Sequence, residues 1–472
     1  MKSSSFFKNS FIGLFFHFSL GTLFSVFISF FTTIFLTSTL STNSFAQVSY
    51  FGSLISTLSI IFALGLDQAY VRFFNSEKPT SRINFLLYLL ILPIIATIIF
   101  TGALLLNPVL FSTIFNYPFS TNHTLFIGLI IALEIILRFS LLYFRMSKFG
   151  LKYSFLISFQ KFIFLCSFFL IYLLNISAIL NFLLSSILSI TLTILVSILF
   201  SRNFNNPFYF SFSTRLPALL KYSFPFLITM TVSSQLETIN KIFLVNLNLY
   251  EDLALYSVAL KIVSILSLVQ GLISTFVIPI MYEKLNKNPE KAFFTNLFVS
   301  ISSLMFIVGL GTILFKDLLI LIFDNRYLAA ARLIPLLTFF PVFYTISEIT
   351  MIGINFKKKT KFHIIISISS YLVGLFINVL LTSNLGAMGS VISIASTYLV
   401  FFLLRTFIGG FYYAFNLNLK IFIPSFVIFI INTLFSTFLI LNQNALIALN
   451  VLSIIIIILM THKFFNRLIK NI

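Results

Sequence analysis

Long apolar runs recur along this chain from one end to the other, and they constrain its fold more than any other feature. Each run has about 20 residues or more, which is the length that an α-helix needs to cross the hydrocarbon core of a bilayer. The sequence is 59% hydrophobic and 9% charged, whereas soluble domains carry about 25% charged residues. We therefore expect an all-α polytopic membrane protein without a soluble domain, and we do not expect an enzyme.

Fourteen transmembrane helices can be placed on the sequence. They are expected at residues 10–36, 45–71, 84–106, 123–144, 153–174, 178–200, 217–247, 253–281, 293–315, 330–354, 362–382, 386–408, 421–441 and 444–462. The longest connections are 202–216 and 316–329. A membrane-embedded polymerase or sugar transferase would need a larger loop for its catalytic groups, so the short connections disfavour that class.

The positions of the basic residues predict the orientation of the chain. If the N-terminus is cytoplasmic, most of the 30 Lys and Arg fall on the cytoplasmic side, and Lys316, Arg326 and Arg332 fall on the outer side. Lys and Arg accumulate in cytoplasmic loops. We therefore expect a multi-pass protein of the cell membrane with both termini in the cytoplasm. The net charge of +19 is then explained by the basic residues of the cytoplasmic loops. No nucleic-acid partner is expected.

The residue types that usually hold metals or cofactors are sparse. Cys166 is the one cysteine, so no internal disulfide can form. The four histidines stand apart, at His17, His123, His363 and His462. The sequence also lacks a Gly-Lys dipeptide, which a phosphate-binding loop requires. We expect no metal site and no cofactor.

Two segments in the halves of the chain begin alike and suggest an internal repeat. Lys8–Phe11 opens the first span much as Lys221–Pro225 opens the seventh. Chance is the alternative, because Lys152–Phe155 is similar but out of register. A true repeat would make residues 1–205 and 206–415 two six-helix bundles, followed by helices thirteen and fourteen in 416–472. Two bundles that rock around a cavity at mid-membrane have the architecture of a transporter.

Eight ionisable residues fall inside the predicted spans. They are Asp67, Glu134, Arg138, Lys161, Glu237, Lys241, Lys261 and Glu348. A charge at the centre of a membrane helix costs about 2.5–3.5 kcal/mol on insertion scales, so these side chains should face protein or water. Glu134 and Arg138 stand four residues apart, as do Glu237 and Lys241. Structural ion pairs are therefore the alternative to a transport pathway.

The four cations of this set are candidates for substrate binding. Arg138, Lys161, Lys241 and Lys261 come from four different spans in both halves of the chain. That placement suits the binding of a polyanion between bundles. Arg72, near the cytoplasmic end of the second span, is a further candidate, although snorkelling to the membrane surface alone would explain it.

The four carboxylates are candidates for ion coupling. Asp67, Glu134 and Glu237 could neutralise the cations at rest, or could take up a coupling proton or sodium ion. Glu348 is the leading candidate, because it has no basic neighbour on its own span within one turn. Burial against the backbone or against another helix is the alternative.

Several stretches of the sequence resemble a known family of transporters. They are Ala63–Phe73, Lys221–Pro225, Tyr256–Ile262, Pro279–Glu283 and Ala331–Thr360. These stretches are similar to the polysaccharide-repeat-unit flippases, the Wzx-type branch of the superfamily that also holds multidrug and toxin extruders and lipid II flippases. That family often carries an Asp-Arg pair in the seventh span, where this chain has Asn240 and Lys241. Any carboxylate role in that span would therefore fall to Glu237.

This resemblance implies a flippase of polysaccharide biosynthesis. Such a protein moves a polyprenyl-pyrophosphate-linked oligosaccharide from the inner to the outer leaflet of the cell membrane by alternating access. Its expected partners are the lipid-linked oligosaccharide, membrane lipid, a polysaccharide polymerase and glycosyltransferases. A multidrug extruder of the same fold is an alternative, which four cations in the cavity would disfavour. A lipid II flippase is the other alternative, since its substrate also carries a pyrophosphate.

Overall fold

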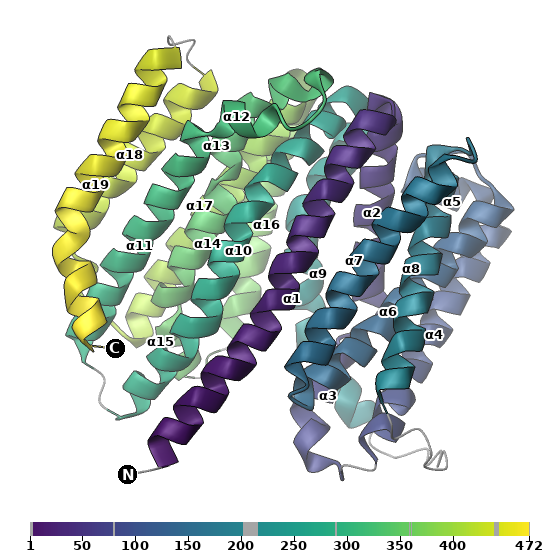
Figure 1. Cartoon of the computed structure of the whole chain (residues 1–472), viewed down its shortest axis with the longest axis horizontal. Helices are drawn as coiled ribbons and strands as arrows, with labels where there is room; N and C mark the ends of the chain where they lie inside the picture. The colour runs from purple at the N-terminus through teal and green to yellow at the C-terminus, as the bar shows by residue number, and fades with distance from the viewer. Residues whose placement is uncertain are drawn as a thin grey trace. The chain divides into compact units, whose positions relative to one another are not determined.

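The computed structural model describes residues 3–78, 81–201, 216–287, 290–357, 359, 361–438 and 443–471. These residues form nineteen α-helices and two 3-10 helices, and none of them forms a strand. Twelve helices are long and apolar enough to cross a membrane, or thirteen if one bent pair counts as a span. The predicted fold class is confirmed: the chain is an all-α, multi-pass membrane protein (Figure 1).

The chain forms two compact units, Met1–Thr238 and Ile239–Ile472. The helices that begin in the first unit are α1 (Ser3–Thr39), α2 (Thr42–Phe62), α3 (Leu66–Phe73), α4 (Arg82–Leu106), α5 (Pro108–Phe115), α6 (Thr121–Met146), α7 (Gly150–Tyr172), α8 (Ala178–Phe200) and α9 (Leu216–Asn246), with the short 3-10 helix η1 (Phe74–Ser76) after α3. Within this unit α6 packs against α2, α4, α7 and α8, and α1 packs along α7. The helix α6 is therefore the central element of the first unit.

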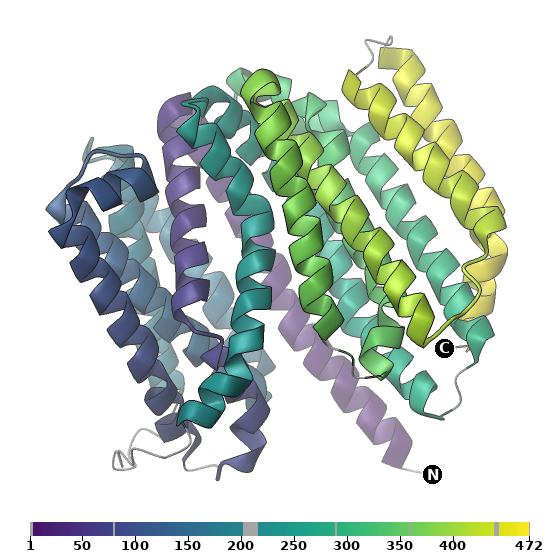
Figure 2. The same ribbon diagram turned by 180° about the vertical axis from the view of Figure 1, so that it is seen from behind.

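The second unit contains the remaining helices. They are α10 (Tyr250–Lys287), α11 (Lys291–Leu314), α12 (Lys316–Ile320), η2 (Asn325–Arg332), α13 (Ile334–Leu337), α14 (Phe339–Thr350), α15 (Ile352–Phe356), α16 (Lys361–Leu385), α17 (Ala387–Tyr412), α18 (Leu419–Phe438) and α19 (Gln443–Asn471). The yellow pair α18 and α19 packs against α11 (Figure 2). Rings from several of these helices interlock there, with Phe306 of α11 stacked on Phe429 of α18.

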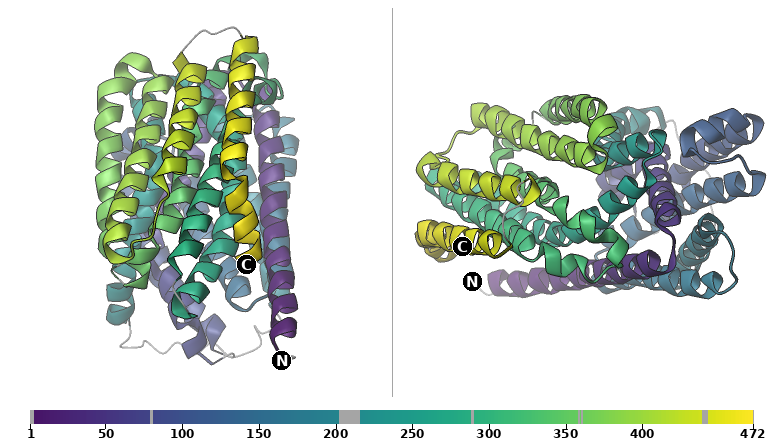
Figure 3. Two further views of the ribbon diagram at one scale, coloured as in Figure 1. Left: turned by 90° about the vertical axis from the view of Figure 1, so that its left-hand side faces the viewer. Right: turned by 90° about the horizontal axis from the view of Figure 1, so that it is seen from above.

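The pair α16 and α17 shows why small residues matter in this unit. The two helices run side by side (Figure 3). A Cβ atom on Gly374 would lie 2.0 Å from the hydroxyl of Thr397, so glycine permits the close approach of the two backbones. Ser393 also donates a hydrogen bond to the Gly374 carbonyl at 2.7 Å. Close packing and interhelical hydrogen bonds replace the hydrophobic effect, which does not drive helix association in lipid.

The second predicted span is broken, where the sequence predicted one helix over 45–71. The helix α2 ends at Phe62, and α3 begins at Leu66. Leu64 and Gly65 between them have φ angles of +54° and +67°. This left-handed conformation stops an α-helix and is easiest for glycine. The prediction of a continuous helix was wrong because periodicity does not report a local reversal of φ.

The tenth predicted span, 330–354, is also discontinuous. Its residues are divided among the end of η2, α13, α14 and part of α15. The segments Asn325–Arg332 and Ile334–Thr350 meet at an angle of 59°. Pro335 stands in the first turn of α13, where proline starts a helix but cannot continue the preceding one. The other predicted spans fall on helices. Residues 439–441, at the end of the thirteenth predicted span, lie outside the described residues. The helix α9 contains an apolar stretch, Leu216–Val232, that is shorter than the twelve candidate spans of the described residues.

Candidate functional site

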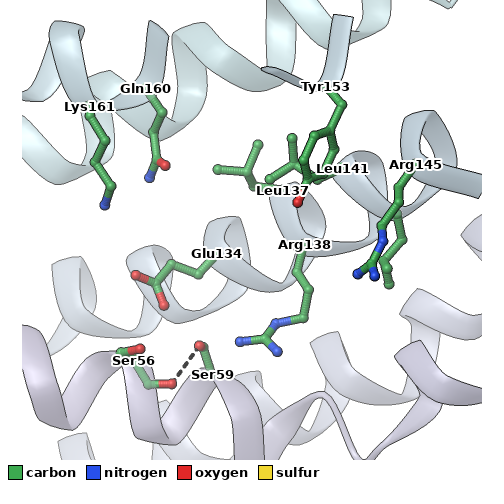
Figure 4. Close-up of a pocket in the computed structure, with 11 residues that line it drawn as sticks. Ser56, Ser59, Glu134, Leu137, Arg138, Leu141, Arg145, Tyr153, Gln160 and Lys161 are labelled. Carbon is green, nitrogen blue, oxygen red and sulfur yellow. Dashed lines mark hydrogen bonds between the residues drawn. The ribbon is translucent and has the colours of Figure 1, made fainter. Parts of the chain in front are cut away.

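A polar cavity of about 330 Å³ lies within the first unit (Figure 4). Its polar lining comes from three helices and consists of Ser56, Ser59, Glu134, Arg138, Arg145, Tyr153, Gln160 and Lys161. Leucine side chains of α6 complete the wall. Ligand pockets commonly measure about 300–1,000 Å³ and combine apolar walls with a few convergent polar groups. The cavity therefore has the size and lining of a small binding site.

Helical periodicity explains how these side chains meet. Glu134, Arg138 and Arg145 on α6 follow one another at intervals of four and seven residues, so they share one face of the helix. On α7, Tyr153 and Gln160 are seven residues apart and face the same cavity. Because α6 packs against both α2 and α7, its polar face borders these two neighbours.

The cavity lining carries more positive than negative charge. Arg138, Arg145 and Lys161 contribute cations, and Glu134 contributes a carboxylate. In Figure 4 the Lys161 side chain of α7 points toward Glu134 of α6, whereas Arg138 extends toward Ser59 of α2. Ser59 itself donates a hydrogen bond to the Ser56 carbonyl at 2.8 Å. The cavity lining therefore has more cations than its single carboxylate can neutralise, and these cations are suited to bind a phosphate or carboxylate.

Asp67 lies behind Arg138, in the first turn of α3. Its Oδ2 atom is 3.8 Å from Nη1 of Arg138, and the two side chains are 5% and 31% exposed, respectively. The sequence suggested Glu134 as the partner of Arg138 through their i,i+4 spacing. The structure adds Asp67, which comes from a helix that the sequence merged with its predecessor.

The other predicted binding residues are not among those that line this cavity. Arg72 is exposed near the end of α3. Lys241 on α9 and Lys261 on α10 belong to the second unit, where both are half-buried. The side chain of Glu237 lies outside the described residues. Of the predicted site residues in the first unit, the structure brings together Arg138, Lys161 and Glu134 at the cavity and places Asp67 next to Arg138.

Asn240, where the resembled family often has a carboxylate, is fully buried in a neutral network. Its side chain donates to the Tyr256 hydroxyl at 3.1 Å and accepts from Asn378 at 2.6 Å. Asn378 in turn accepts from Thr382. The network joins α9, α10 and α16 within the second unit. Amide and hydroxyl groups here satisfy one another without a charge.

Glu348 lies in a second polar cluster of that unit. It is 9% exposed, and it accepts a hydrogen bond from Ser274 of α10. Arg405 of α17 interacts with it electrostatically. Glu348 thus has a basic partner from another helix, which a search along its own span could not find.

The Arg405 side chain contacts a hydroxyl group and two aromatic rings. It is 9% exposed, and its Nη1 atom donates to the Ser347 hydroxyl at 3.1 Å. Its guanidinium lies 3.9 Å from the centre of the Phe401 ring and 5.1 Å from that of Tyr344. The helix α17 continues to Tyr412, beyond the predicted end of that span at 408, and the Arg405 side chain is buried within it.

Sequence reasoning also missed part of the cavity. Arg145 was not among the predicted site residues, although its seven-residue spacing from Arg138 places the two side chains on one face of the helix. Tyr153, Gln160 and Ser59 are uncharged, so a search for intramembrane charges passed over them. Two spacings could have indicated them. Gln160 is adjacent to Lys161, and Tyr153 precedes Gln160 by seven residues. Among the described residues there is no group of three His, Cys, Asp or Glu that could hold a metal.

Comparison with known proteins identifies relatives of this architecture. The structure is similar to the lipid II flippase MurJ in an inward closed conformation, with a TM-score of 0.69 and 17% identity over 96% of this chain and 99% of that one. It is also similar to an inward-facing multidrug resistance MATE family transporter of the MOP superfamily, with a TM-score of 0.60 and 14% identity over 83% of this chain and 94% of that one. A MOP superfamily transporter from Pyrococcus furiosus gives a TM-score of 0.56 at 14% identity, over 85% and 94% of the two chains.

These structural similarities show the fold alone, whereas a match of the sequence to a protein family shows the family. No curated protein sequence matches the chain. Residues 14–285 match the family described as "Polysaccharide biosynthesis protein". Because this match spans more than half of the 472 residues, the chain belongs to the polysaccharide biosynthesis protein family.

Proposed function

We propose that this protein flips a polyprenyl-pyrophosphate-linked oligosaccharide from the inner to the outer leaflet of the cell membrane by alternating access. Its membership of a polysaccharide biosynthesis family supports the substrate class. The observation that carries the proposal is the cationic cavity within a membrane-spanning unit. A pyrophosphate needs several cations around it, and Arg138, Arg145 and Lys161 line one cavity.

Each group of the cavity has a proposed role. Arg138, Arg145 and Lys161 bind the phosphate oxygens through charge-assisted hydrogen bonds. Glu134 and Gln160 accept hydrogen bonds from the sugar hydroxyls. The polyprenyl tail stays in lipid, where its apolar surface needs no partner. Arg72, Lys241 and Lys261 stay predicted substrate contacts outside the described cavity.

Ion coupling is assigned to the buried carboxylates. Glu348 remains the leading candidate, because it accepts a bond from Ser274 and faces Arg405 inside the second unit. Protonation of Glu348 would weaken its attraction to Arg405 and thereby couple ion uptake to the packing of α14 and α17. Glu134, Glu237 and Asp67 are the secondary candidates.

The proposal includes the orientation, the organisation and the partners of the chain. Both termini lie in the cytoplasm, as the distribution of Lys and Arg predicts. Residues 1–205 and 206–415 act as two six-helix bundles, and 416–472 supply the last two helices. Reporter fusions after residues 40, 120 and 384 should give external signals, and fusions after 148 and 287 cytoplasmic ones. A cytoplasmic signal at 384 would contradict this topology. Glycosyltransferases supply the substrate, and a polysaccharide polymerase consumes it.

The transport of a lipid-linked oligosaccharide into proteoliposomes tests this function. Arg138→Ala and Lys161→Ala should each lower transport about tenfold or more, the effect of losing a charge-assisted hydrogen bond. Lys161→Arg should keep more activity than Lys161→Ala. Lys152→Ala is the matched control, because Lys152 also lies on α7 but donates to the Phe200 carbonyl at 3.0 Å.

Two outcomes would reject the proposal in favour of its alternatives. Full transport by both alanine variants would remove the cavity cations from the mechanism. Transport of lipophilic cations, without transport of any pyrophosphate lipid, would identify a multidrug extruder. Preference for lipid II over a polyprenyl-pyrophosphate-linked repeat unit would identify a lipid II flippase, which shares the required pyrophosphate chemistry.

A further inference from the structure

Asp67 and Arg138 form an ion pair at the edge of the cavity. Arg138 lines the cavity, whereas Asp67 lies behind it on α3 and is nearly buried. The guanidinium is therefore close to an internal carboxylate and also borders the space that would hold a ligand.

The pair is loose in comparison with another ion pair of the same protein. Arg138 Nη1 is 3.8 Å from the nearer Asp67 oxygen, which exceeds hydrogen-bond distance. In contrast, Arg326 Nε donates to Asp324 at 2.8 Å. Asp67 thus attracts the Arg138 guanidinium without taking up one of its donors, and those donors remain suited to bind an anion in the cavity.

The break between α2 and α3 holds Asp67 in this place. A Cβ atom on Gly65 would lie 2.5 Å from the Ser223 carbonyl oxygen of α9, so the left-handed glycine rests directly on that backbone. The helix α3 restarts at Leu66 and puts Asp67 in its first turn. The Gln68 backbone N–H donates to Oδ1 of Asp67 at 2.9 Å, and Nε2 of Gln68 donates to Oδ2 at 3.3 Å. The carboxylate is therefore anchored independently of Arg138.

We propose that Asp67 is the resting counter-ion of Arg138 and that the anionic head group of the substrate displaces it. The inference rests on the proposed function, and it assigns Asp67 as a positioning residue that sets the affinity for the head group. A bound diphosphate would take the guanidinium donors, and the attraction to Asp67 would oppose that binding. On release, the same attraction returns Arg138 to its resting place. Asp67 thereby weakens binding and speeds release.

Binding and transport should consequently respond in opposite directions. Removing the charge with Asp67→Asn should tighten binding of geranylgeranyl diphosphate in detergent micelles by about two- to fivefold, the upper part of the range measured for ion pairs that are not fully buried. The uncharged geranylgeraniol should bind the two proteins equally. Transport at saturating substrate should fall, because release becomes slower. A residue that only stabilised the fold would not raise affinity while it lowered turnover.

A second variant changes the pair in the other direction. Asp67→Glu keeps the charge on a longer side chain, which shortens the gap to Arg138 and should weaken diphosphate binding by about two- to threefold. This variant tests the proposal even if Asp67→Asn does not fold.

A double-mutant cycle separates the pair from the general charge of the cavity. In an Arg138→Gln background, Asp67→Asn should no longer change affinity, since its target is absent. Glu134→Gln is the comparison variant, because Glu134 lines the same cavity. Because Glu134 interacts with Lys161 as well as with Arg138, part of its effect should remain in that background.

The outcomes separate this inference from the proposed function. If the parent protein binds the diphosphate but neither Asp67 variant changes its affinity, the counter-ion role is overturned and the flippase proposal stands. An equal effect of Asp67→Asn with and without Arg138 would also overturn it. If the parent protein does not bind the diphosphate, the proposed function and this inference fall together.

Discussion

The two units of the protein accommodate positive charge in different ways. In the first, Arg138, Arg145 and Lys161 line a cavity, and the ion pair of Arg138 is 3.8 Å long. In the second, Arg405 donates to Ser347 at 3.1 Å and stacks on an aromatic ring. A charge inside a membrane protein must be satisfied by protein, water or ligand. The contrast shows which cations retain donors for a substrate and which are part of the packing.

The same contrast applies to the carboxylates of the two units. Glu134 lines the cavity, whereas Glu348 is 9% exposed and is held between Ser274 and Arg405. A group at a cavity can exchange partners with a ligand at little structural cost. A group inside the packing can change its charge only if its neighbours also respond, which suits a coupling role better than a binding role.

The strongest test of this contrast is the removal of Arg405. Arg405→Met would leave Glu348 buried without the electrostatic attraction of Arg405, and a buried charge that is not compensated is strongly destabilising. We expect a large loss of folded protein, measured by thermal unfolding in detergent and by the monodisperse yield. Arg138→Met should change stability much less. A stable Arg405→Met variant that merely lost transport would place Arg405 among the binding residues and end the contrast.

The next effect concerns the break that places Asp67 in the first unit. Gly65→Ala should destabilise the protein by about 1–2 kcal/mol through its left-handed conformation alone, and the contact with Ser223 adds to that loss. Gly102→Ala in α4 is the matched control, because a Cβ atom there would meet nothing within 4 Å. Thermal unfolding of both variants measures the difference. Equal stability of the two would mean that the break does not constrain the unit.

A smaller effect is expected at Arg145, an exposed residue that lines the cavity and was not among the predicted site residues. Arg145→Ala should lower oligosaccharide transport about tenfold, the value of one charge-assisted hydrogen bond. Its unfolding temperature should change little, since cavity cations are not part of the packing. Arg82→Ala is the control. The Arg82 guanidinium lies 4.2 Å from the centre of the Phe74 ring, and Arg82 does not line the cavity. Parallel losses of transport in both variants would mean that overall charge matters, not the cavity.

The smallest expected change in affinity is at Glu348. Glu348→Gln mimics the protonated acid, so it should preserve head-group binding within about twofold while the response to an imposed pH or sodium gradient disappears. Transport in proteoliposomes with and without the gradient measures this response. Asp317→Asn controls for loss of an exposed acid, since Asp317 is 44% exposed and pairs with Lys316. A gradient response equal to that of the parent would leave Glu348 with a structural role.

Much of the architecture could be predicted from the sequence, because hydropathy and charge act locally. The membrane-spanning class and the twelve long apolar helices in the described part of the chain followed from apolar runs of sufficient length. The breaks at Gly65 and near Pro335 were missed, since each depends on a local backbone conformation inside an otherwise apolar run. Apolar length predicts a span, but it does not predict where the backbone turns within it.

The sequence by itself determined that this chain crosses a membrane many times and that a few ionisable groups had to be sheltered inside it. Helical spacing also placed Glu134 and Arg138 on one face of α6. Only the tertiary structure decided the partners: it set Asp67 behind Arg138, brought Lys161 to the same cavity, and enclosed Arg405 beside Glu348. Partners on different helices depend on how those helices pack, whereas hydropathy and periodicity are properties of each segment alone.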